Sequence, residues 1–231
     1  MSAMDCEKAS RLMGSNFFGP REWEKFYGAK FTKDQLDKLW QFPWSEETLN
    51  APCPFCNDGK AVKDCHFALL GISRIQRNLV NLRYLHQIHP RGKQPRFNTY
   101  DQMAWYLKQP FANTTAPERW YLIHLHPLPY SMGKTYPQQV ELLIKVTQDY
   151  EVPPAVIFVK ANLFFFRRTG SFPKNSDHGR ALYRCCDSIL YDSVSLHPVV
   201  GTFGKDGICI GGLRDNYGDP KITIAASRLP E

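Results

Sequence analysis

The side chains best suited to chemistry lie together in one stretch, residues 53–66. This stretch holds three of the seven cysteines, a histidine, two aspartates and two lysines, and an apolar segment follows it. Thiolate, imidazole and carboxylate groups can bind a metal ion, or act as nucleophile and base. The stretch matches no active-site signature, so spacing and surroundings must decide between these chemistries.

A first hypothesis is a zinc site. The candidate ligands are Cys53, Cys56, Cys65 and His66. The CxxC spacing of the first two cysteines is half of a zinc knuckle, but a structural site needs four ligands and the sequence has no second CxxC. His86 and His89 would complete a site only if the fold brought them near. Buried thiols in a loop are the alternative interpretation, and it is favoured. Zinc is therefore the one cofactor that the sequence suggests, but the sequence does not favour it.

A second hypothesis is nucleophilic catalysis. Cys53 and His66 would form a thiolate–imidazole pair, with Asp64 orienting the ring. Asp64 and His66 would share a face if the strand began early enough to include both. Lys60 would then bind an anionic group of the substrate. A cysteine between two prolines equally fits a small apolar side chain that fills a turn.

A third candidate is the sequence His124-Leu125-His126. Alternation along a strand would place both imidazoles on one face, which suits a metal ion or a proton relay. Histidines on the surface of an edge strand are the alternative interpretation. This pair therefore stays a separate candidate, without a link to the cysteines.

Composition narrows the class of protein. The chain has 231 residues, of which 43% are hydrophobic and 22% charged, as in globular proteins. The net charge of +7 comes from scattered basic residues, which favours an acidic protein or a small ligand as partner over nucleic acid. An odd number of cysteines, with Cys185 and Cys186 adjacent, indicates a reducing compartment. We expect a cytoplasmic protein without a membrane span or secretory signal.

Helix signals are frequent in the first three quarters of the chain. We expect a flexible N-terminus over residues 1–15 and a single domain over residues 16–231. Capping-box pairs predict helices that begin after Thr32 and Thr135. Apolar residues at helical spacing favour another helix over residues 74–89, and Pro153-Pro154 opens an apolar helix that ends at Gly170.

Strand signals surround these helices. Apolar runs predict strands over residues 67–72 and 120–125, and short strands follow Arg180. The turn Gly204–Gly207 contains Asp-Gly, which tolerates the positive φ of a hairpin. The predicted fold is α+β, with N-terminal helices, a central buried helix pair and an antiparallel C-terminal sheet.

Several short pieces carry a resemblance to known sequences. They are Pro52-Cys53-Pro54-Phe55, Gly59-Lys60, Asp64-Cys65-His66, Trp120, Lys134-Thr135-Tyr136, Gln138-Gln139, Tyr150-Glu151-Val152-Pro153, Thr169-Gly170, Val200-Gly201, Phe203-Gly204 and Gly207. Together they resemble a family of uncharacterised bacterial proteins that read Pro-Cys-Pro-Phe, then Gly-Lys, then Asp-Thr-His before an apolar strand. The resemblance covers most of the chain from about residue 40 onward, and it implies a grouping without catalytic residues. Cys56 and Cys65 depart from that pattern.

These observations predict a bacterial protein that acts as a ligand- or protein-binding module. The alternative is a cysteine-dependent hydrolase or transferase that uses Cys53 and His66. An enzyme of this kind needs a cleft that holds Cys53, His66 and Asp64 together. A binding module would instead show these side chains apart, or hydrogen-bonded to the backbone.

Overall fold

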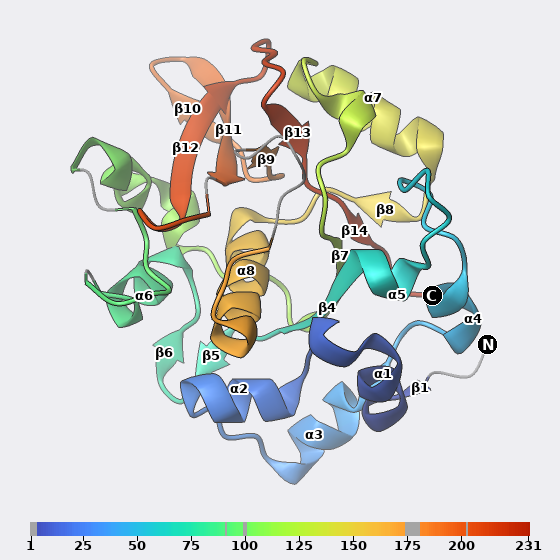
Figure 1. Ribbon diagram of the computed structural model, residues 1–231. Coiled ribbons are helices and arrows are strands. Elements are labelled where there is room, and N and C mark those ends of the chain that lie inside the picture. The colour runs from blue at the N-terminus through green and yellow to red at the C-terminus, as the bar shows by residue number, and fades with distance from the viewer. Residues whose placement is uncertain (1–3, 91, 99–100, 174–180, 202) are drawn as a thin grey trace.

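Two five-stranded sheets and the helices around them form the protein. The computed structural model describes residues 4–90, 92–98, 101–173, 181–201 and 203–231. Helices and strands mix along the chain, so the predicted α+β class is confirmed. Figure 1 shows the N-terminal helices at one end of the molecule and the C-terminal sheet at the other.

The first sheet carries the candidate residues. Its strands, in spatial order, are β2 (Phe17–Phe18), β4 (His66–Gly71), β7 (Arg119–His124), β14 (Ser227–Arg228) and β8 (Tyr150–Glu151). Strands β4 and β7 are antiparallel, and His66 lies directly opposite His124. Every residue of β4 is buried, as the apolar run predicted. The pairing joins segments that are far apart in the sequence.

The second sheet is built from the C-terminal part of the chain. Its strands are β9 (Leu182–Arg184), β10 (Ile189–Tyr191), β11 (Val194–Gly201), β12 (Cys209–Arg214) and β13 (Ile222–Ile224). All pairs are antiparallel except β9 with β13. The predicted hairpin between β11 and β12 is present. Gly207 takes φ +97°, and a Cβ there would meet the Arg96 carbonyl oxygen at 2.6 Å, so the turn needs glycine.

The apolar helix α8 (Ala155–Thr169) lies at the centre of Figure 1. It begins after Pro154 and ends at Gly170, which takes the left-handed conformation of a helix C-cap. Its first ten residues are buried, from Ala155 to Phe164. This run includes Lys160, an ionisable side chain in the middle of the core.

Lys160 is 1% exposed, and its Nζ donates to the Ile72 carbonyl at 2.9 Å. Burial lowers the pKa of this amine to about 7. Between that value and the usual lysine pKa the unfolded chain binds more protons than the folded chain, so this group makes stability rise with pH. Relative to Lys160→Met, we expect the wild type to gain about 2 kcal/mol between about pH 7 and about pH 9. Urea unfolding of both proteins at the two pH values measures this difference in the free energy of unfolding. If the free energies of both proteins changed equally with pH, the prediction would be contradicted.

The N-terminal segment differs from the expected loose chain. Strand β1 (Met4–Asp5) pairs with β3 (Gln41–Phe42), and helix α1 (Cys6–Met13) follows. Asp5 caps this helix by accepting a hydrogen bond from the Lys8 amide. Three apolar side chains of α1 are buried, which holds the segment against the rest of the protein. Residues 1–3 lie outside the described residues.

The next helices follow their sequence signals. Helix α2 (Pro20–Tyr27) ends at the left-handed Gly28, and α3 (Lys33–Leu39) begins after its Thr32 cap. Short elements connect this layer to the sheet. They are η1 (Gly14–Asn16), α4 (Glu46–Asn50) and α5 (Val62–Cys65).

The helix predicted over residues 74–89 is only half correct. Strands β5 (Arg74–Ile75) and β6 (Asn78–Leu79) form a small hairpin in its place, with Gln76 at φ +54° in the turn. Helix α6 (Leu82–Ile88) begins only after Asn81, whose side chain accepts from the Tyr84 amide. This cap was not recognised in the sequence, and it sets the start of the helix. The 3-10 helices η2 (Asp101–Lys108) and η3 (Pro110–Asn113) come next.

The described residues form two hydrophobic cores. The larger core surrounds α8 and the first sheet. The smaller one lies beneath helix α7 (Tyr136–Val146), whose predicted capping box at Thr135 is present, and near η4 (Pro129–Ser131). The buried residues of this second core are Cys53, Phe55, Cys65, Leu128, Leu143, Tyr150, Ile224 and Ala226. Two of the candidate cysteines therefore belong to a small separate core.

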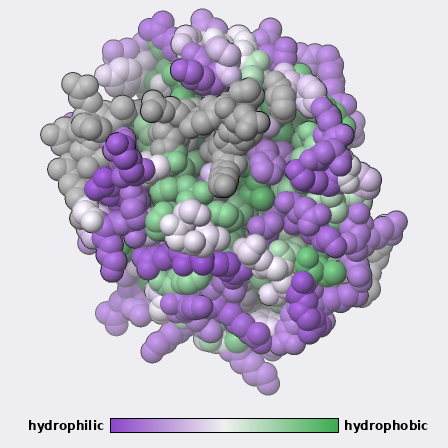
Figure 2. Space-filling view, viewed as in Figure 1, coloured by the Kyte–Doolittle hydropathy of each residue, from purple (hydrophilic) through white to green (hydrophobic). Residues whose placement is uncertain are grey.

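One face of the molecule is mostly hydrophilic. On the face in Figure 2, hydrophilic side chains cover most of the area, and apolar ones show in small groups between them. Within the described residues, no helix combines the length and the apolar character needed to cross a membrane.

Candidate metal centre

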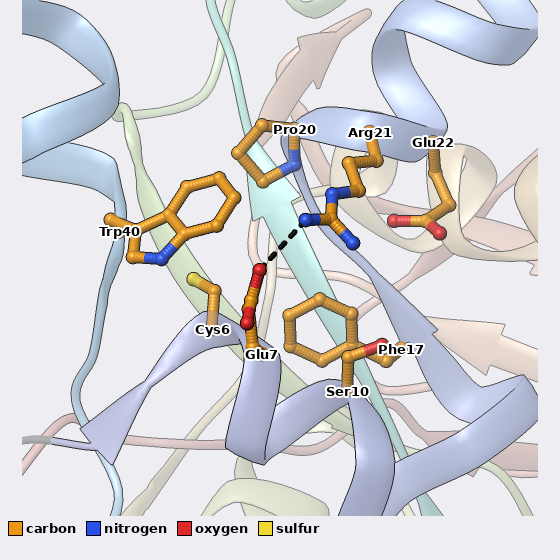
Figure 3. A pocket seen from close by; sticks show the side chains of 8 residues that line it. All are labelled: Cys6, Glu7, Ser10, Phe17, Pro20, Arg21, Glu22 and Trp40. Carbon is orange, nitrogen blue, oxygen red and sulfur yellow. Dashed lines mark hydrogen bonds and ion pairs between the residues drawn. The ribbon is translucent and has the colours of Figure 1, made fainter.

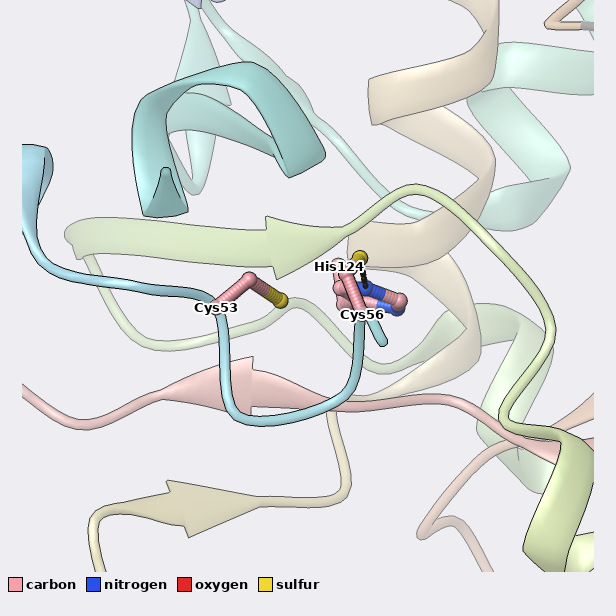
Figure 4. Close-up of side chains that lie close together, drawn as sticks. All are labelled: Cys53, Cys56 and His124. Atoms are coloured by element: carbon pink, nitrogen blue, oxygen red, sulfur yellow. Dashed lines mark hydrogen bonds between the residues drawn. The ribbon is translucent and has the colours of Figure 1, made fainter. Parts of the chain in front are cut away.

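The cysteine loop is held in a tight turn by its own backbone. Pro52 and Ala61 form an isolated bridge at its base, and the Cys53 amide donates to the Lys60 carbonyl at 2.8 Å. The Cys56 amide donates back to the Cys53 carbonyl, which closes the turn between the two cysteines. Gly59 reverses the chain at φ +70°. The turn brings both CxxC side chains to the same side of the loop (Figure 4).

Two sulfur atoms and one ring nitrogen meet at this loop, and the sulfur of Cys65 lies beside one of them. The ligand atoms of Cys53, Cys56 and His124 all lie within 4.8 Å of one another. Cys56 Sγ is 3.7 Å from His124 Nε2 and 3.1 Å from Cys65 Sγ. Figure 4 shows the Cys56 side chain lying against the His124 ring. The loop and the adjacent helix α5 thus supply the sulfurs, and the distant strand β7 supplies the nitrogen.

Cys53 is a buried thiol at the start of the loop. Its side chain is 4% exposed, and burial raises the pKa of the thiol to about 11. The backbone amides of Phe55 and Cys56 favour a lower pKa, but burial outweighs them. Such amide donors favour the charged sulfur, because hydrogen bonds to a charged form stabilise that form. Burial likewise raises the pKa of Cys65. A bound cation would remove the protons from both sulfurs.

His124 is prepared to bind a metal through Nε2. Its Nδ1 lies 2.9 Å from the His126 carbonyl oxygen, which can only accept, so Nδ1 carries the proton. Burial, and then the neighbouring His126, lower the pKa of His124 to about 3, which keeps the ring neutral near pH 7. The Nε2 lone pair therefore faces Cys56. A backbone carbonyl on the other ring nitrogen is the usual arrangement around a metal-binding histidine.

His66 lies beside this cluster but is held differently. Its Nδ1 donates to the Val62 carbonyl at 2.8 Å, and its Nε2 accepts from the Tyr150 hydroxyl at 3.0 Å. Burial holds the pKa of this ring well below its usual value. Both ring nitrogens are thus engaged by other groups. The structure places His124, rather than the proposed His66, against the cysteine sulfurs.

The other residues of the catalytic hypothesis lie apart. The strand begins only at His66, because Val62–Cys65 forms a helical turn, so Asp64 does not share a strand face with His66. Asp64 is exposed. Lys60 is also exposed, and its Nζ forms an ion pair with Asp58 at 2.6 Å. The proposed anion-binding amine therefore already has a carboxylate partner.

The remaining histidine candidates have other partners. His89 donates to the Pro95 carbonyl and accepts from the Tyr27 hydroxyl, so both of its ring nitrogens have partners other than the cysteines. His86 contacts the Tyr106 hydroxyl at 2.6 Å. His126 contributes its backbone carbonyl to His124, while its half-buried side chain lies outside the cluster of ligand atoms. The His124-Leu125-His126 pair thus supplies one ligand and its support.

Aromatic rings enclose the cluster. Phe55 packs edge-on against His124 and Tyr150, with ring centroids 5.1 and 4.8 Å apart. His66 and His124 also meet edge to face at 5.0 Å. These contacts exclude water from one side of the site and fix the two imidazoles. The sequence did not place Tyr150 at this site, because its position depends on the pairing of β8 with β14.

Hollows are also present elsewhere on the described part of the surface. The one in Figure 3 has a volume of about 30 Å³, room for about one water molecule, beside the Glu7–Arg21 ion pair. The second has about 590 Å³. It is lined by Ala104, Trp105, Lys108, Gln109, Tyr191, Leu196 and Gly212. Sequence analysis missed this hollow, since η2, β10 and β12 meet only in the fold.

Known proteins add no information about this site. No protein-family model matches the chain, and neither a curated protein nor a solved structure does. The resemblance seen in the sequence therefore stays a prediction. Any statement about function must come from the geometry.

Proposed function

We propose that this protein binds one zinc ion through three cysteines and one histidine, and that the ion stabilises the fold. The ligands are Cys53, Cys56, Cys65 and His124. The observation that carries the proposal is the group formed by Cys53, Cys56 and His124, whose ligand atoms lie within 4.8 Å of one another. The Nε2 lone pair of His124 faces Cys56, and the Cys65 sulfur lies 3.1 Å from the Cys56 sulfur, which makes it the fourth ligand that we propose. Three cysteines with one histidine form a common ligand set of structural zinc.

The distances around Cys56 approach those of tetrahedral zinc, whereas Cys65 must move toward the other ligand atoms, because it lies outside the group that fits within 4.8 Å. Zinc–sulfur bonds of about 2.3 Å and zinc–nitrogen bonds of about 2.0 Å place sulfur and nitrogen about 3.6 Å apart, and two sulfurs about 3.8 Å apart. The Cys56 Sγ–His124 Nε2 distance of 3.7 Å agrees with this. The two sulfurs of Cys56 and Cys65, 3.1 Å apart, need to separate by less than about 1 Å.

Four protein ligands support a structural role over a catalytic one. A catalytic zinc ion keeps a position open for water or substrate, whereas this set fills the tetrahedron. Three of the ligands, Cys53, Cys65 and His124, are buried. A hydrolase based on Cys53 and His66 has less support, because both nitrogens of His66 are engaged by Val62 and Tyr150.

Metal analysis of the native protein tests the proposal. We expect one zinc ion per chain after purification without added metal, and cobalt substitution should give the absorption bands of tetrahedral thiolate-bound cobalt. The variant Cys56→Ser should lose the metal. The variant Cys186→Ser, which removes an exposed thiol elsewhere, should keep it. Wild-type protein that stays metal-free after incubation with zinc would overturn the proposal.

A second function, ligand binding, is favoured by the larger hollow. Its volume of about 590 Å³ lies in the range of small-molecule sites. Trp105 and Tyr191 supply aromatic surface, and Lys108 supplies a positive charge, so we propose a small aromatic anion as ligand. A Cβ at Gly212 would approach the Trp105 ring to 2.6 Å, so this indole packs directly on β12.

A fluorescent aromatic sulfonate, anilinonaphthalene sulfonate, serves as the probe for this hollow. We expect saturable binding to the native protein that Trp105→Ala and Lys108→Ala both weaken by about tenfold, the effect of about 1.4 kcal/mol. The variant Lys145→Ala, which removes an exposed lysine of helix α7, should bind as the wild type does. Equal binding by all four proteins would rule out this hollow as the site.

A further inference from the structure

We infer that Cys56 and Cys65 form an oxidation site, at which a peroxide converts the two thiolates into a disulfide and expels the metal. The release of metal rests on the zinc site proposed above. The formation of the disulfide rests on the positions of the two sulfurs alone. The two parts can therefore be tested separately.

The two sulfurs are already close to bonding distance. They lie 3.1 Å apart, and a disulfide bond of about 2.05 Å requires an approach of about 1 Å. Cys56 belongs to the turn that includes Gly59, and Cys65 ends the single helical turn α5. Cys56 lies in a loop rather than in a helix or strand, so its side chain can rotate and bring its sulfur closer to that of Cys65.

Exposure selects the sulfur that an oxidant meets first. Cys56 is half-buried, whereas Cys53 is 4% exposed and Cys65 is fully buried. An oxidant therefore reaches Cys56, and the neighbouring Cys65 lies in position to resolve the product.

The reaction balances with hydrogen peroxide as oxidant. The Cys56 sulfur attacks one peroxide oxygen, the O–O bond breaks, and the departing oxygen leaves as water while Cys56 becomes a sulfenic acid. The Cys65 sulfur then attacks the Cys56 sulfur, the S–O bond breaks, and a second water leaves. Solvent supplies the two protons that the metal-bound thiolates lack. Two of the four ligands are consumed, so the zinc ion dissociates.

Tryptic mapping tests which cysteines join. Trypsin cuts after Lys38, Lys60, Lys63 and Arg74, so residues 39–60 carry both Cys53 and Cys56, while residues 64–74 carry Cys65. After peroxide treatment, blocking of remaining thiols and digestion, we expect these two peptides to be joined. The cross-link should persist in Cys53→Ser and vanish in Cys56→Ser. A colorimetric zinc indicator follows metal release in the same samples, and Cys186→Ser serves as the control.

The outcomes distinguish the formation of the disulfide from the release of the metal. Joined peptides together with one released zinc ion support the whole inference. Joined peptides from a protein that never held zinc support the oxidation site and reject the zinc proposal. Zinc present beforehand, followed by a peptide 39–60 that is two hydrogens lighter with Cys65 still reduced, assigns the disulfide to Cys53 and Cys56 and overturns the inference. Zinc retained with no disulfide also overturns it.

Discussion

Replacing His124 with alanine is expected to weaken zinc binding by a factor of about 100 or more. The apparent binding free energy of a structural zinc ion, about 10–16 kcal/mol, is shared among four ligands, so one ligand contributes about 3 kcal/mol. The Nε2 atom of His124, 3.7 Å from Cys56 Sγ, is the single nitrogen ligand in the proposed set. Competition with a chromophoric chelator measures the affinity.

His126→Ala is the matched control for this experiment. The two histidines are neighbours in the sequence, but His126 contributes its backbone carbonyl, which alanine retains. We expect this variant to bind zinc as tightly as the wild type. Equal losses in both variants would argue against His124 as the ligand, and a loss in His126→Ala alone would reverse the assignment.

Removing the metal is expected to lower the midpoint of thermal unfolding by roughly 10 °C. Zinc at a thousand times its dissociation constant stabilises the folded state by about 4 kcal/mol, and each kcal/mol shifts the midpoint by about 2–4 °C in a chain of this length. Calorimetry with and without a strong chelator measures the shift. The same midpoint in both samples would contradict a structural role.

Hydrogen exchange locates the effect of metal removal. The ligands Cys53 and Cys65 belong to the second core, which packs against α7, whereas α8 belongs to the larger core. Amides of residues 53–66 and of Tyr136–Val146 should therefore exchange faster without metal, while those of Ala155–Thr169 keep their protection. Uniform acceleration over all three segments would show that the ion acts on the whole fold.

Local signals in the sequence predicted much of the fold. The caps at Thr32 and Thr135, and the Pro154 and Gly170 boundaries of α8, lie where the structure has them. These signals act within one turn of a helix, so neighbouring residues reveal them. The hairpin in residues 74–79 was missed because Gln76 adopts a positive φ that its residue type does not indicate.

The candidate site was only partly predictable, for a different reason. The cysteines of the loop are close in sequence, and their spacing suggested a zinc site as one hypothesis, although buried thiols were the favoured interpretation. The fourth ligand depends on the register between β4 and β7, which sets His66 opposite His124. The residue type of both histidines suits zinc binding. The hydrogen bonds of His66 to Val62 and Tyr150, which the sequence does not reveal, exclude His66 and leave His124 as the candidate. Long-range pairing of this kind leaves no local trace.

Strand β14 has a consequence for synthesis on the ribosome. It is inserted between β7 and β8, so β8 joins the first sheet only through residues 227–228. All four proposed zinc ligands lie within residues 53–124, and a nascent chain therefore exposes them long before this strand, Tyr150 and the other late residues of the second core emerge. An ion captured at that stage would shield the three thiols and hold the loop against β7 until the rest of the chain arrives.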